Sequence, residues 1–339
     1  MIELFAVTTR GLENVGAEEM ACLPAMRIDE VGYRRIAAAY AGPLESVLAL
    51  RTVDDLFIRL AEWQGISHHR AALATLHQLS LDLDLWQAAG VRGQVSRLSA
   101  LPTFSVSANF VGRRNYTVDE IKRAVAGGIE AISGWAYRTG DQESEINIRL
   151  FMEHEQVYVG MRLGERPLYK RAYKPAHVPG SLKPSVAAAL LRLAGVRAGE
   201  TVLDPCCGAG TILIEAALLG AQAQGGDSAA AALEAAQTNA RAAGVEIDLR
   251  LWDARRLPLD AGAVDHIVTN LPWGRQVEIE PARFYAEVCR EMQRVVGSRG
   301  STALLTTLPQ LVDLPALRLS SQRTISLFGQ QATILVFAG

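Results

Sequence analysis

The chain has few of the residues that build disulfide-linked or zinc-binding proteins. Four cysteines occur among 339 residues, none in a Cys-x-x-Cys spacing, and the six histidines form no ligand pattern. The cysteines are Cys22, Cys206, Cys207 and Cys289. This usage predicts a reducing compartment, no structural zinc and no bound metal.

Long apolar runs and an export signal are absent as well. No uninterrupted hydrophobic stretch is long enough to cross a bilayer, and the N-terminus lacks a basic segment and carries Glu3. The first residues are instead typical of a β-strand. We therefore expect a cytoplasmic protein that does not bind membranes.

Lysine is scarce, with four residues against 30 arginines, and the formal net charge is only −2. A general bias toward alanine and arginine explains most of this ratio, although arginine also favours bidentate contacts with phosphates and bases. Nucleic-acid binding would therefore depend on local basic patches. The length exceeds one ordinary core and predicts two or three domains of globular composition.

The first half of the chain is predicted to be α+β. Strands are expected over residues 2–9, 55–62 and 104–110, helices over 12–23 and 44–50, and a hairpin over 146–152 and 156–162. Thr117 and Glu120 form a capping box that starts a helix ending near Ser133. Nothing in this half has the pattern of a catalytic site.

The second half is predicted to be an α/β domain. A stretch over residues 163–184 holds four prolines and two glycines, and a strand–helix alternation follows it. Such an alternation indicates a parallel sheet covered on both faces. The expected strands lie at 201–203, 223–225, 247–251, 266–269 and 302–306, with a terminal hairpin at 323–327 and 332–337. A sheet that ends in a reversed strand suits a methyltransferase better than a dehydrogenase.

Residues 201–215 predict a strand, a glycine-bearing turn and the start of a helix. Gly208 and Gly210 allow the backbone to approach a ligand closely. A dinucleotide-binding turn would carry a third small residue where this chain has Leu213, and Asp204 at the strand end would repel a pyrophosphate. The same carboxylate attracts the positive charges of S-adenosylmethionine. The methyltransferase hypothesis is therefore favoured over a nicotinamide dehydrogenase.

Two more acids follow the next two predicted strands. Asp227 can accept both ribose hydroxyls, and Asp253 can accept from the adenine amino group. Each acid alone is better explained as a solvated residue or a helix cap. Together with Asp204 they lie at successive strand ends, where ligands bind open α/β sheets, and so they predict the cofactor site.

The run Asn270-Leu271-Pro272-Trp273-Gly274 carries the predicted chemistry. An exocyclic base amine is a weak nucleophile because its lone pair is delocalised into the ring. The Asn270 side-chain oxygen and the Leu271 carbonyl could accept its two N–H bonds and direct the lone pair toward the methyl donor. Pro272 would stiffen the turn, and Trp273 offers a face on which an extruded base can stack. A strand-ending turn with a packed tryptophan is the structural alternative.

These residues resemble the amino-methyltransferase family whose fourth motif is Asn/Asp-x-Pro-aromatic. The whole chain is similar to the THUMP-domain branch of that family, the RNA guanine-N2 methyltransferases. The similar segments are residues 104–122 for the THUMP strand–turn–helix, 168–174 and 181–184 for the start of the catalytic domain, and 204–217 for the first motif. The resemblance adds Pro184 and Cys207 to the cofactor-binding residues, and it places Asn270 in both the cofactor-binding and the catalytic set.

The resemblance also implies the architecture. We expect a class I Rossmann-like methyltransferase domain, with a seven-stranded sheet whose last strand is antiparallel, preceded by α+β ferredoxin-like and THUMP domains. The expected boundaries are 1–65 for the ferredoxin-like domain, 66–163 for the THUMP domain, 164–180 for a linker and 181–339 for the methyltransferase domain.

The implied partner is tRNA, with no protein partner indicated. The run at Asn270 is nearest the enzymes that methylate guanine 6 of the acceptor stem. Many relatives have Asp in place of Asn270 and a second proline in place of Leu271, so guanine 10 and a ribosomal site stay open as alternatives. A DNA substrate, or a non-catalytic RNA-binding module with this fold, are further alternatives.

Basic residues agree with an RNA partner. Five of them, between positions 162 and 174, stand against the single acid Glu165: Arg162, Arg166, Lys170, Arg171 and Lys174. The predicted substrate-binding set is Trp273, Arg275, Arg113, Arg114, Lys170, Arg171 and Lys174. Phosphate contacts would explain the set as a whole, while surface solubility explains any single member equally well.

Overall fold

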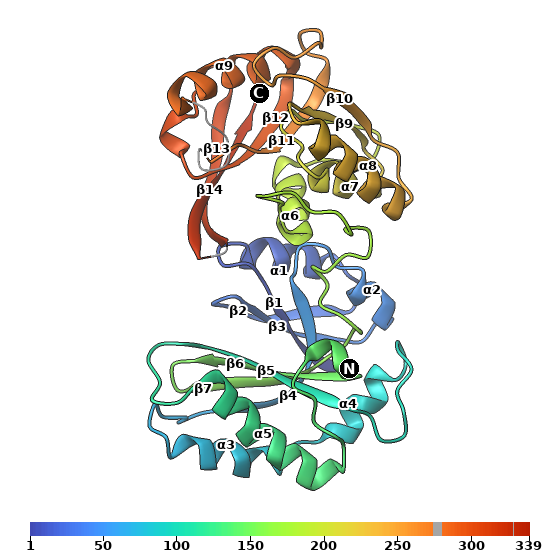
Figure 1. Cartoon of the computed structure of the whole chain (residues 1–339), viewed down its shortest axis with the longest axis vertical. Helices are drawn as coiled ribbons and strands as arrows, with labels where there is room; N and C mark the ends of the chain where they lie inside the picture. The colour runs from blue at the N-terminus through green and yellow to red at the C-terminus, as the bar shows by residue number, and fades with distance from the viewer. Residues whose placement is uncertain (274–279, 328) are drawn as a thin grey trace. The chain divides into compact units, whose positions relative to one another are not determined.

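The computed structural model describes residues 1–273, 280–327 and 329–339 (Figure 1). The chain forms two compact units, one of residues 1–7, 19–50 and 54–168, the other of residues 8–18, 51–53 and 169–339. Each unit is built on its own seven-stranded sheet. Within the described part of the chain, no helix has the length and apolar character needed to cross a bilayer.

The sheet of the first unit has the order β2-β3-β1-β4-β7-β6-β5 and is antiparallel except between β5 and β6. Its strands are β1 Ile2–Val7, β2 Met26–Gly32, β3 Arg35–Tyr40, β4 Asp55–Trp63, β5 Phe104–Val111, β6 Ile146–Glu153 and β7 Gln156–Arg162. Its helices are α2 Leu44–Leu48, α3 Ala72–Ser80, α4 Leu85–Arg92, α5 Val118–Ser133 and the short η1 Asp141–Glu143, while α1 Glu13–Ala21 has residues in both units.

Several predicted elements of this unit are confirmed. Thr117 Oγ1 accepts the N–H of Glu120 at 3.2 Å, and the Glu120 carboxylate accepts the N–H of Thr117 at 2.8 Å, so the capping box starts α5. The hairpin of β6 and β7 is also present. The β2–β3 hairpin and helices α3 and α4 were not predicted. Most side chains of β2 are partly or fully exposed, which weakens the apolar alternation that marks a half-buried strand.

The sheet continues across the predicted boundary between residues 65 and 66. Phe57 of β4 pairs with Arg162 of β7, so strands from the expected ferredoxin-like and THUMP segments lie side by side in one sheet. The division of this unit into two domains stays a prediction.

The sheet of the second unit has the order β10-β9-β8-β11-β12-β14-β13, and only β14 runs antiparallel to its neighbours. Its strands are β8 Thr201–Asp204, β9 Gln222–Asp227, β10 Asp248–Leu251, β11 Val264–Asn270, β12 Val296–Thr306, β13 Arg318–Leu327 and β14 Gln330–Ala338. Its helices are α6 Pro184–Ala194, α7 Thr211–Leu218, α8 Ala230–Ala243, α9 Pro281–Val295 and the short η2 Pro309–Leu311. The predicted methyltransferase sheet with a reversed last strand is confirmed.

Both faces of this sheet are buried. Val202 and Val268 pack with α6 and α7 in one apolar cluster, whereas their chain neighbours Leu203 and Ile267 pack with α9 in another. Figure 1 shows α6 and α7 on one side of the sheet and α9 on the other. The chain order reverses between β8 and β11, and in open α/β sheets ligands bind at the carboxyl ends of the strands beside such a switch point.

Candidate active site

The carboxyl ends of β8 and β11 meet at this switch point. Ile267 of β11 is in register with Leu203 of β8, so Asp204 and Asn270 end neighbouring strands. Thr269 Oγ1 donates to Asp204 Oδ1 at 2.6 Å and ties the two strand ends together. The structure therefore brings the predicted cofactor acid and the predicted catalytic amide to one edge of the sheet.

Asp204 is a buried carboxylate, with 2% of its surface exposed. Burial raises its pKa to about 7, and the charge of Asp227 adds to this, while hydrogen bonds from Thr269 and from the Cys206 N–H (3.2 Å) oppose it. No cation within the described residues pairs with it by a salt bridge. Such a group gains from a bound positive charge, and a bound sulfonium or ammonium would supply one.

The glycine loop after β8 is held by backbone contacts. Gly208 and Gly210 adopt φ values of +51° and +75°, which side chains rarely tolerate. The Cys207 N–H donates to the Gly226 carbonyl at 3.0 Å and joins the loop to β9. A Cβ on Gly226 would lie 2.2 Å from the Arg250 carbonyl oxygen, so a side chain there would disrupt the sheet beside the loop.

Asp227 ends β9 and faces this loop. Its Oδ2 accepts the Gly208 N–H and its Oδ1 accepts the Ala229 N–H, each at 3.0 Å. A carboxylate oxygen has more than one acceptor site, so both oxygens can still receive a hydroxyl. This geometry fits the predicted contact with a ribose.

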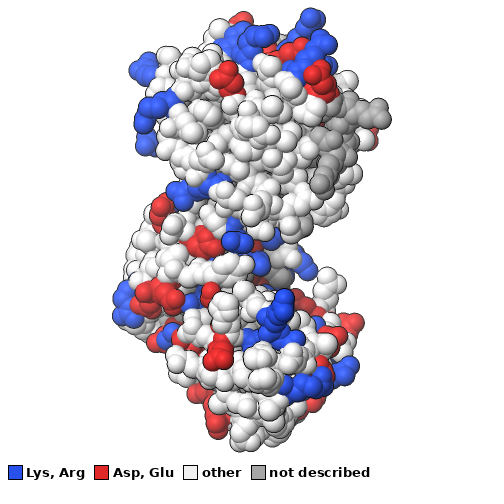
Figure 2. Space-filling model, turned by 90° about the vertical axis from the view of Figure 1, so that its left-hand side faces the viewer, with Lys and Arg blue, Asp and Glu red and all other residues white. Residues whose placement is uncertain are grey.

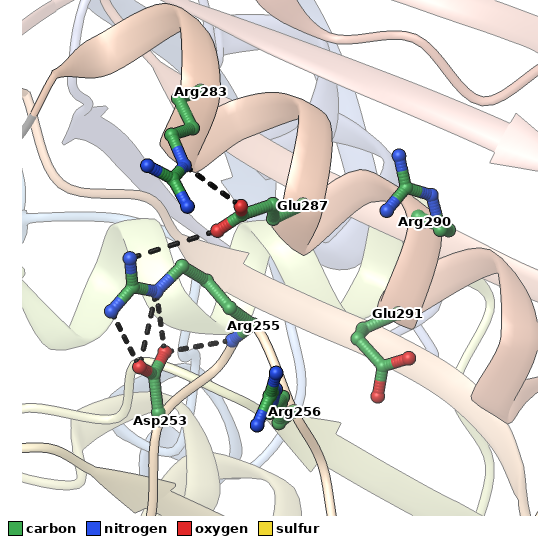
Figure 3. A pocket seen from close by; sticks show the side chains of 7 residues that line it. All are labelled: Asp253, Arg255, Arg256, Arg283, Glu287, Arg290 and Glu291. Atoms are coloured by element: carbon green, nitrogen blue, oxygen red, sulfur yellow. Dashed lines mark hydrogen bonds and ion pairs between the residues drawn. The ribbon is translucent and has the colours of Figure 1, made fainter.

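Asp253 follows β10 and is already in an ion pair. Arg255 Nη2 lies 2.6 Å from Asp253 Oδ2, Arg255 Nε contacts both oxygens, and the Asp253 side chain is 47% exposed (Figure 3). The hydrogen bond from Arg255 holds the pKa of this carboxyl below its usual value. Asp253 would thus contact an adenine amino group while it remains bonded to the Arg255 guanidinium. Sequence analysis did not predict this arginine partner.

The active turn is the segment Asn270–Trp273. Trp273 Nε1 donates to Asn270 Oδ1 at 3.1 Å, and its ring packs against the apolar cluster of α6 and α7. Leu271 is fully buried, and its N–H donates to the Leu305 carbonyl at 3.0 Å. The predicted base-stacking tryptophan is therefore partly buried and bonded to the predicted catalytic amide. Gly274 and Arg275 lie outside the described residues.

A buried tyrosine supports this turn, and sequence analysis missed it. The Tyr285 hydroxyl of α9 lies 3.1 Å from the Pro272 carbonyl oxygen and 2.6 Å from Thr306 Oγ1, which accepts the Leu308 N–H at 2.9 Å. Since the Tyr285 proton goes to the carbonyl, Thr306 donates its own proton to Tyr285. The apolar period of α9 could show that Tyr285 is buried, but nothing local indicates where its hydroxyl points.

Pro184 begins a helix, and Cys207 lies within the glycine loop. Pro184 is the buried first residue of α6, where a missing N–H costs nothing. Cys207 is buried within the glycine loop, and burial raises the pKa of its thiol well above the usual value. Cys207 is therefore an uncharged side chain beside the cofactor acids.

Glu215 of α7 is a fully buried acid that engages three groups from distant parts of the chain. Arg51 Nε donates to it at 2.7 Å, Arg171 Nε lies 3.6 Å away, and the Tyr173 hydroxyl donates to its other oxygen. Arg171, which was predicted to contact RNA, thus forms an ion pair with a buried carboxylate.

Three more predicted RNA contacts also have protein partners. Lys174 Nζ donates to the Leu182 carbonyl, and burial lowers its pKa to about 8. In the first unit, Arg114 donates to the carbonyls of residues 66 and 67 at 2.8 and 3.0 Å, and Arg162 lies buried against Asp55 at 2.8 Å. Of the predicted cations, Arg113, Arg166 and Lys170 are exposed.

Comparisons with known proteins place these features in a family. Residues 171–329 match the family described as RMKL-like, methyltransferase domain. The tRNA (guanine(6)-N2)-methyltransferase of Thermus thermophilus is 32% identical over 91% of this chain and 90% of its own length. The bovine U6 snRNA (guanine-N(2))-methyltransferase THUMPD2 is 31% identical over 66% of this chain and 43% of its own length.

The solved structure of TrmN from Thermus thermophilus matches this fold with a TM-score of 0.80 and 29% identity, over 100% of this chain and 99% of that one. The similarity therefore extends over both units. The chain is a methyltransferase and belongs to the same family as the tRNA (guanine(6)-N2)-methyltransferase of Thermus thermophilus.

Proposed function

We propose that this methyltransferase transfers the methyl group of S-adenosylmethionine to the exocyclic N2 of a guanine in tRNA, guanine 6 of the acceptor stem, in the cytoplasm. The observation that carries the proposal is the joining of Asp204 and Asn270 at one sheet edge through Thr269. Asp204, which would attract the positively charged methyl donor, therefore lies next to Asn270, which would accept a hydrogen bond from the substrate amine.

The chain's own residues fit the cofactor. S-adenosylmethionine supplies an electrophilic methyl group on a positively charged sulfur when it is bound. Asp204 offers a buried negative charge to its cationic end, and the Gly208–Gly210 turn leaves space for close backbone approach. Asp227, which binds the Gly208 and Ala229 N–H groups, would accept the ribose hydroxyls, and Asp253, paired with Arg255, would accept the adenine amino group.

Asn270 activates the guanine amine by orientation. Its Oδ1 has two lone pairs, and Trp273 occupies only one of them. The second accepts one N–H of the amine, and the Leu271 carbonyl accepts the other, so that the nitrogen lone pair is directed at the methyl group. The methylated ammonium is acidic and loses its proton to water, so no side chain has to act as a strong base.

The names of the relatives support guanine N2 as the acceptor more strongly than they support one RNA. Both relatives are named guanine-N2 methyltransferases, one for tRNA and one for U6 snRNA. The relative that spans nearly the full chain acts on tRNA, and it favours tRNA here. Guanine 10 of tRNA and a ribosomal guanine are the alternatives within the same chemistry.

Nucleoside mass spectrometry tests the assignment. The purified full chain should form N2-methylguanosine in a tRNA transcript with guanine 6, and not in the matched transcript with adenine at that position. Asn270→Ala should lower kcat by about 10²- to 10³-fold, the usual cost of losing one oriented polar group in the transition state. Its affinity for S-adenosylmethionine by calorimetry should stay close to that of the wild type, because the change removes an interaction with the acceptor amine.

Three outcomes would overturn the proposal. Methylation of another atom would exclude guanine N2 as the acceptor. Methylation confined to guanine 10 or to ribosomal RNA would exclude guanine 6 of tRNA as the methylated nucleotide. Failure to bind S-adenosylmethionine would favour a non-catalytic RNA-binding module.

A further inference from the structure

A cleft of about 440 Å³ opens in the second unit where the segment after β10 faces α9 (Figure 3). Four arginines line it, two from each side: Arg255, Arg256, Arg283 and Arg290. Figure 2 shows basic and acidic side chains gathered at the top of this unit, the end at which Figure 1 places α9.

The carboxylates of the cleft are already neutralised. Arg283 Nε lies 3.0 Å from Glu287, and Arg255 Nη1 lies 3.6 Å from the other oxygen of the same carboxylate. Asp253 is paired with Arg255, as described above. Glu291, the third acid of the cleft, pairs with Arg294 at 2.8 Å. Each acid therefore has a guanidinium partner.

Two arginines of the cleft remain in excess. Arg256 and Arg290 are exposed, and the residues that the structure describes give neither of them a carboxylate partner within 4.0 Å. With Arg294, five guanidinium groups stand against three carboxylates. Among the described residues that line the cleft or pair with its acids, the guanidinium groups thus outnumber the carboxylates by two, although the net charge of the chain is −2.

The cleft adjoins the active turn through α9. The buried face of this helix carries Tyr285, whose hydroxyl contacts the Pro272 carbonyl, while Arg283 and Arg290 lie on its exposed face. On the other side of the cleft, Asp253 belongs to the proposed cofactor site. The cleft therefore shares α9 with the active turn and Asp253 with the proposed cofactor site.

We propose that this cleft binds the phosphate backbone of the substrate RNA next to the methylated guanine, with Arg256 and Arg290 as the phosphate ligands; this inference rests on the proposed function. A guanidinium group donates in a planar, bidentate manner that matches a phosphate. Arg256 and Arg290 can bind without breaking an ion pair, whereas Arg255 and Arg283 are already paired with Asp253 and Glu287.

The test compares two double variants of the full chain that remove the same charge. Arg256→Ala with Arg290→Ala empties the cleft of its unpaired cations. Arg241→Ala with Arg299→Ala removes two exposed arginines from α8 and from the amino-terminal half of β12. Binding to a tRNA transcript is measured over a series of salt concentrations, together with KM for that transcript and calorimetric affinity for S-adenosylmethionine.

The cleft variant should lower the slope of log K against log salt by about two, roughly one per lost phosphate contact. It should raise KM for tRNA about tenfold or more while binding S-adenosylmethionine as the wild type does. The control variant should keep the wild-type slope and KM.

An unchanged slope and KM in the cleft variant would overturn this inference, and so would equal losses in both variants, because net charge alone would then explain them. If the cleft variant no longer binds S-adenosylmethionine, the two arginines maintain the structure of the domain, and this result would also overturn the inference. If the wild-type chain methylates no guanine N2, the proposed function fails first, and this distinguishes the two failures.

Discussion

The indole N–H of Trp273 donates to Oδ1 of Asn270 at 3.1 Å, three positions along the same turn. This bond fixes which way the side-chain amide faces, because rotating the amide by 180° would bring its NH₂ group against the indole N–H. It also leaves one lone pair of Oδ1 free. Trp273 therefore positions the amide that we assign to the amine of the substrate.

The first prediction concerns Trp273→Phe, which keeps an aromatic ring but removes the N–H donor. We expect kcat for tRNA methylation to fall about tenfold, the effect of losing one hydrogen bond of about 1.4 kcal/mol, because the amide of Asn270 is no longer held in one orientation. KM for tRNA should change little, since the ring remains. Single-turnover kinetics measure the change, and wild-type kcat in this variant would contradict the positioning role.

The second prediction is a pH dependence of cofactor binding. Burial holds the pKa of Asp204 at about 7 in the free protein, and the cationic cofactor binds its ionised form. The affinity for S-adenosylmethionine should therefore be constant above pH 8 and fall about tenfold per pH unit below pH 6. Calorimetry between pH 5.5 and 8.5 measures it.

Asp204→Asn is the control for this pH dependence. Its affinity should be lower than that of the wild type at pH 8, because the negative charge is lost, and it should lack the fall in affinity between pH 8 and pH 6. A wild-type affinity that does not vary with pH, or a fall that persists in the variant, would assign the titration to another group.

The third prediction concerns the hydroxyl groups beneath the active turn. Tyr285→Phe removes the donor to the Pro272 carbonyl and the acceptor for Thr306. We expect a loss of about 1 to 3 kcal/mol in the free energy of unfolding, since buried polar groups are left unpaired. We also expect a lower kcat with an unchanged cofactor affinity.

Thr306→Val is the matched change on the other side of that contact. If the two hydroxyls act as one network, the double variant should cost less than the sum of the single variants in urea unfolding and in kcat. Strict additivity of the effects on kcat would show that the two hydroxyls act independently and would contradict the network.

The fourth prediction concerns Glu215. Its replacement by alanine leaves Arg51 and Arg171, with 25% and 13% of their side chains exposed, without their shared carboxylate. Removing one partner of a buried ion pair costs about 3 to 5 kcal/mol in the free energy of unfolding. Urea denaturation measures it, with Glu234→Ala as a control at an exposed position of α8. Equal stability of the two variants would contradict the structural role of Glu215.

Local sequence pattern was enough for the elements that depend on near neighbours. The capping box of Thr117 and Glu120, the glycine turn at Gly208 and the alternation of strands and helices after residue 200 each follow from residues a few positions apart. The β2–β3 hairpin was missed because most of β2 is exposed and carries little apolar pattern.

Sequence by itself determined that acids lie at or just after the ends of successive parallel strands and that an Asn-x-Pro-aromatic turn begins at the end of β11. Strand ends and turns can be predicted in this way because they depend on short segments of sequence. Only the tertiary structure decided which cations are available to a substrate. Arg51 and Glu215 lie 164 positions apart, and Tyr285 reaches Pro272 across 13. A buried charge or hydroxyl takes whichever partner packing brings near it, so these assignments required the folded chain.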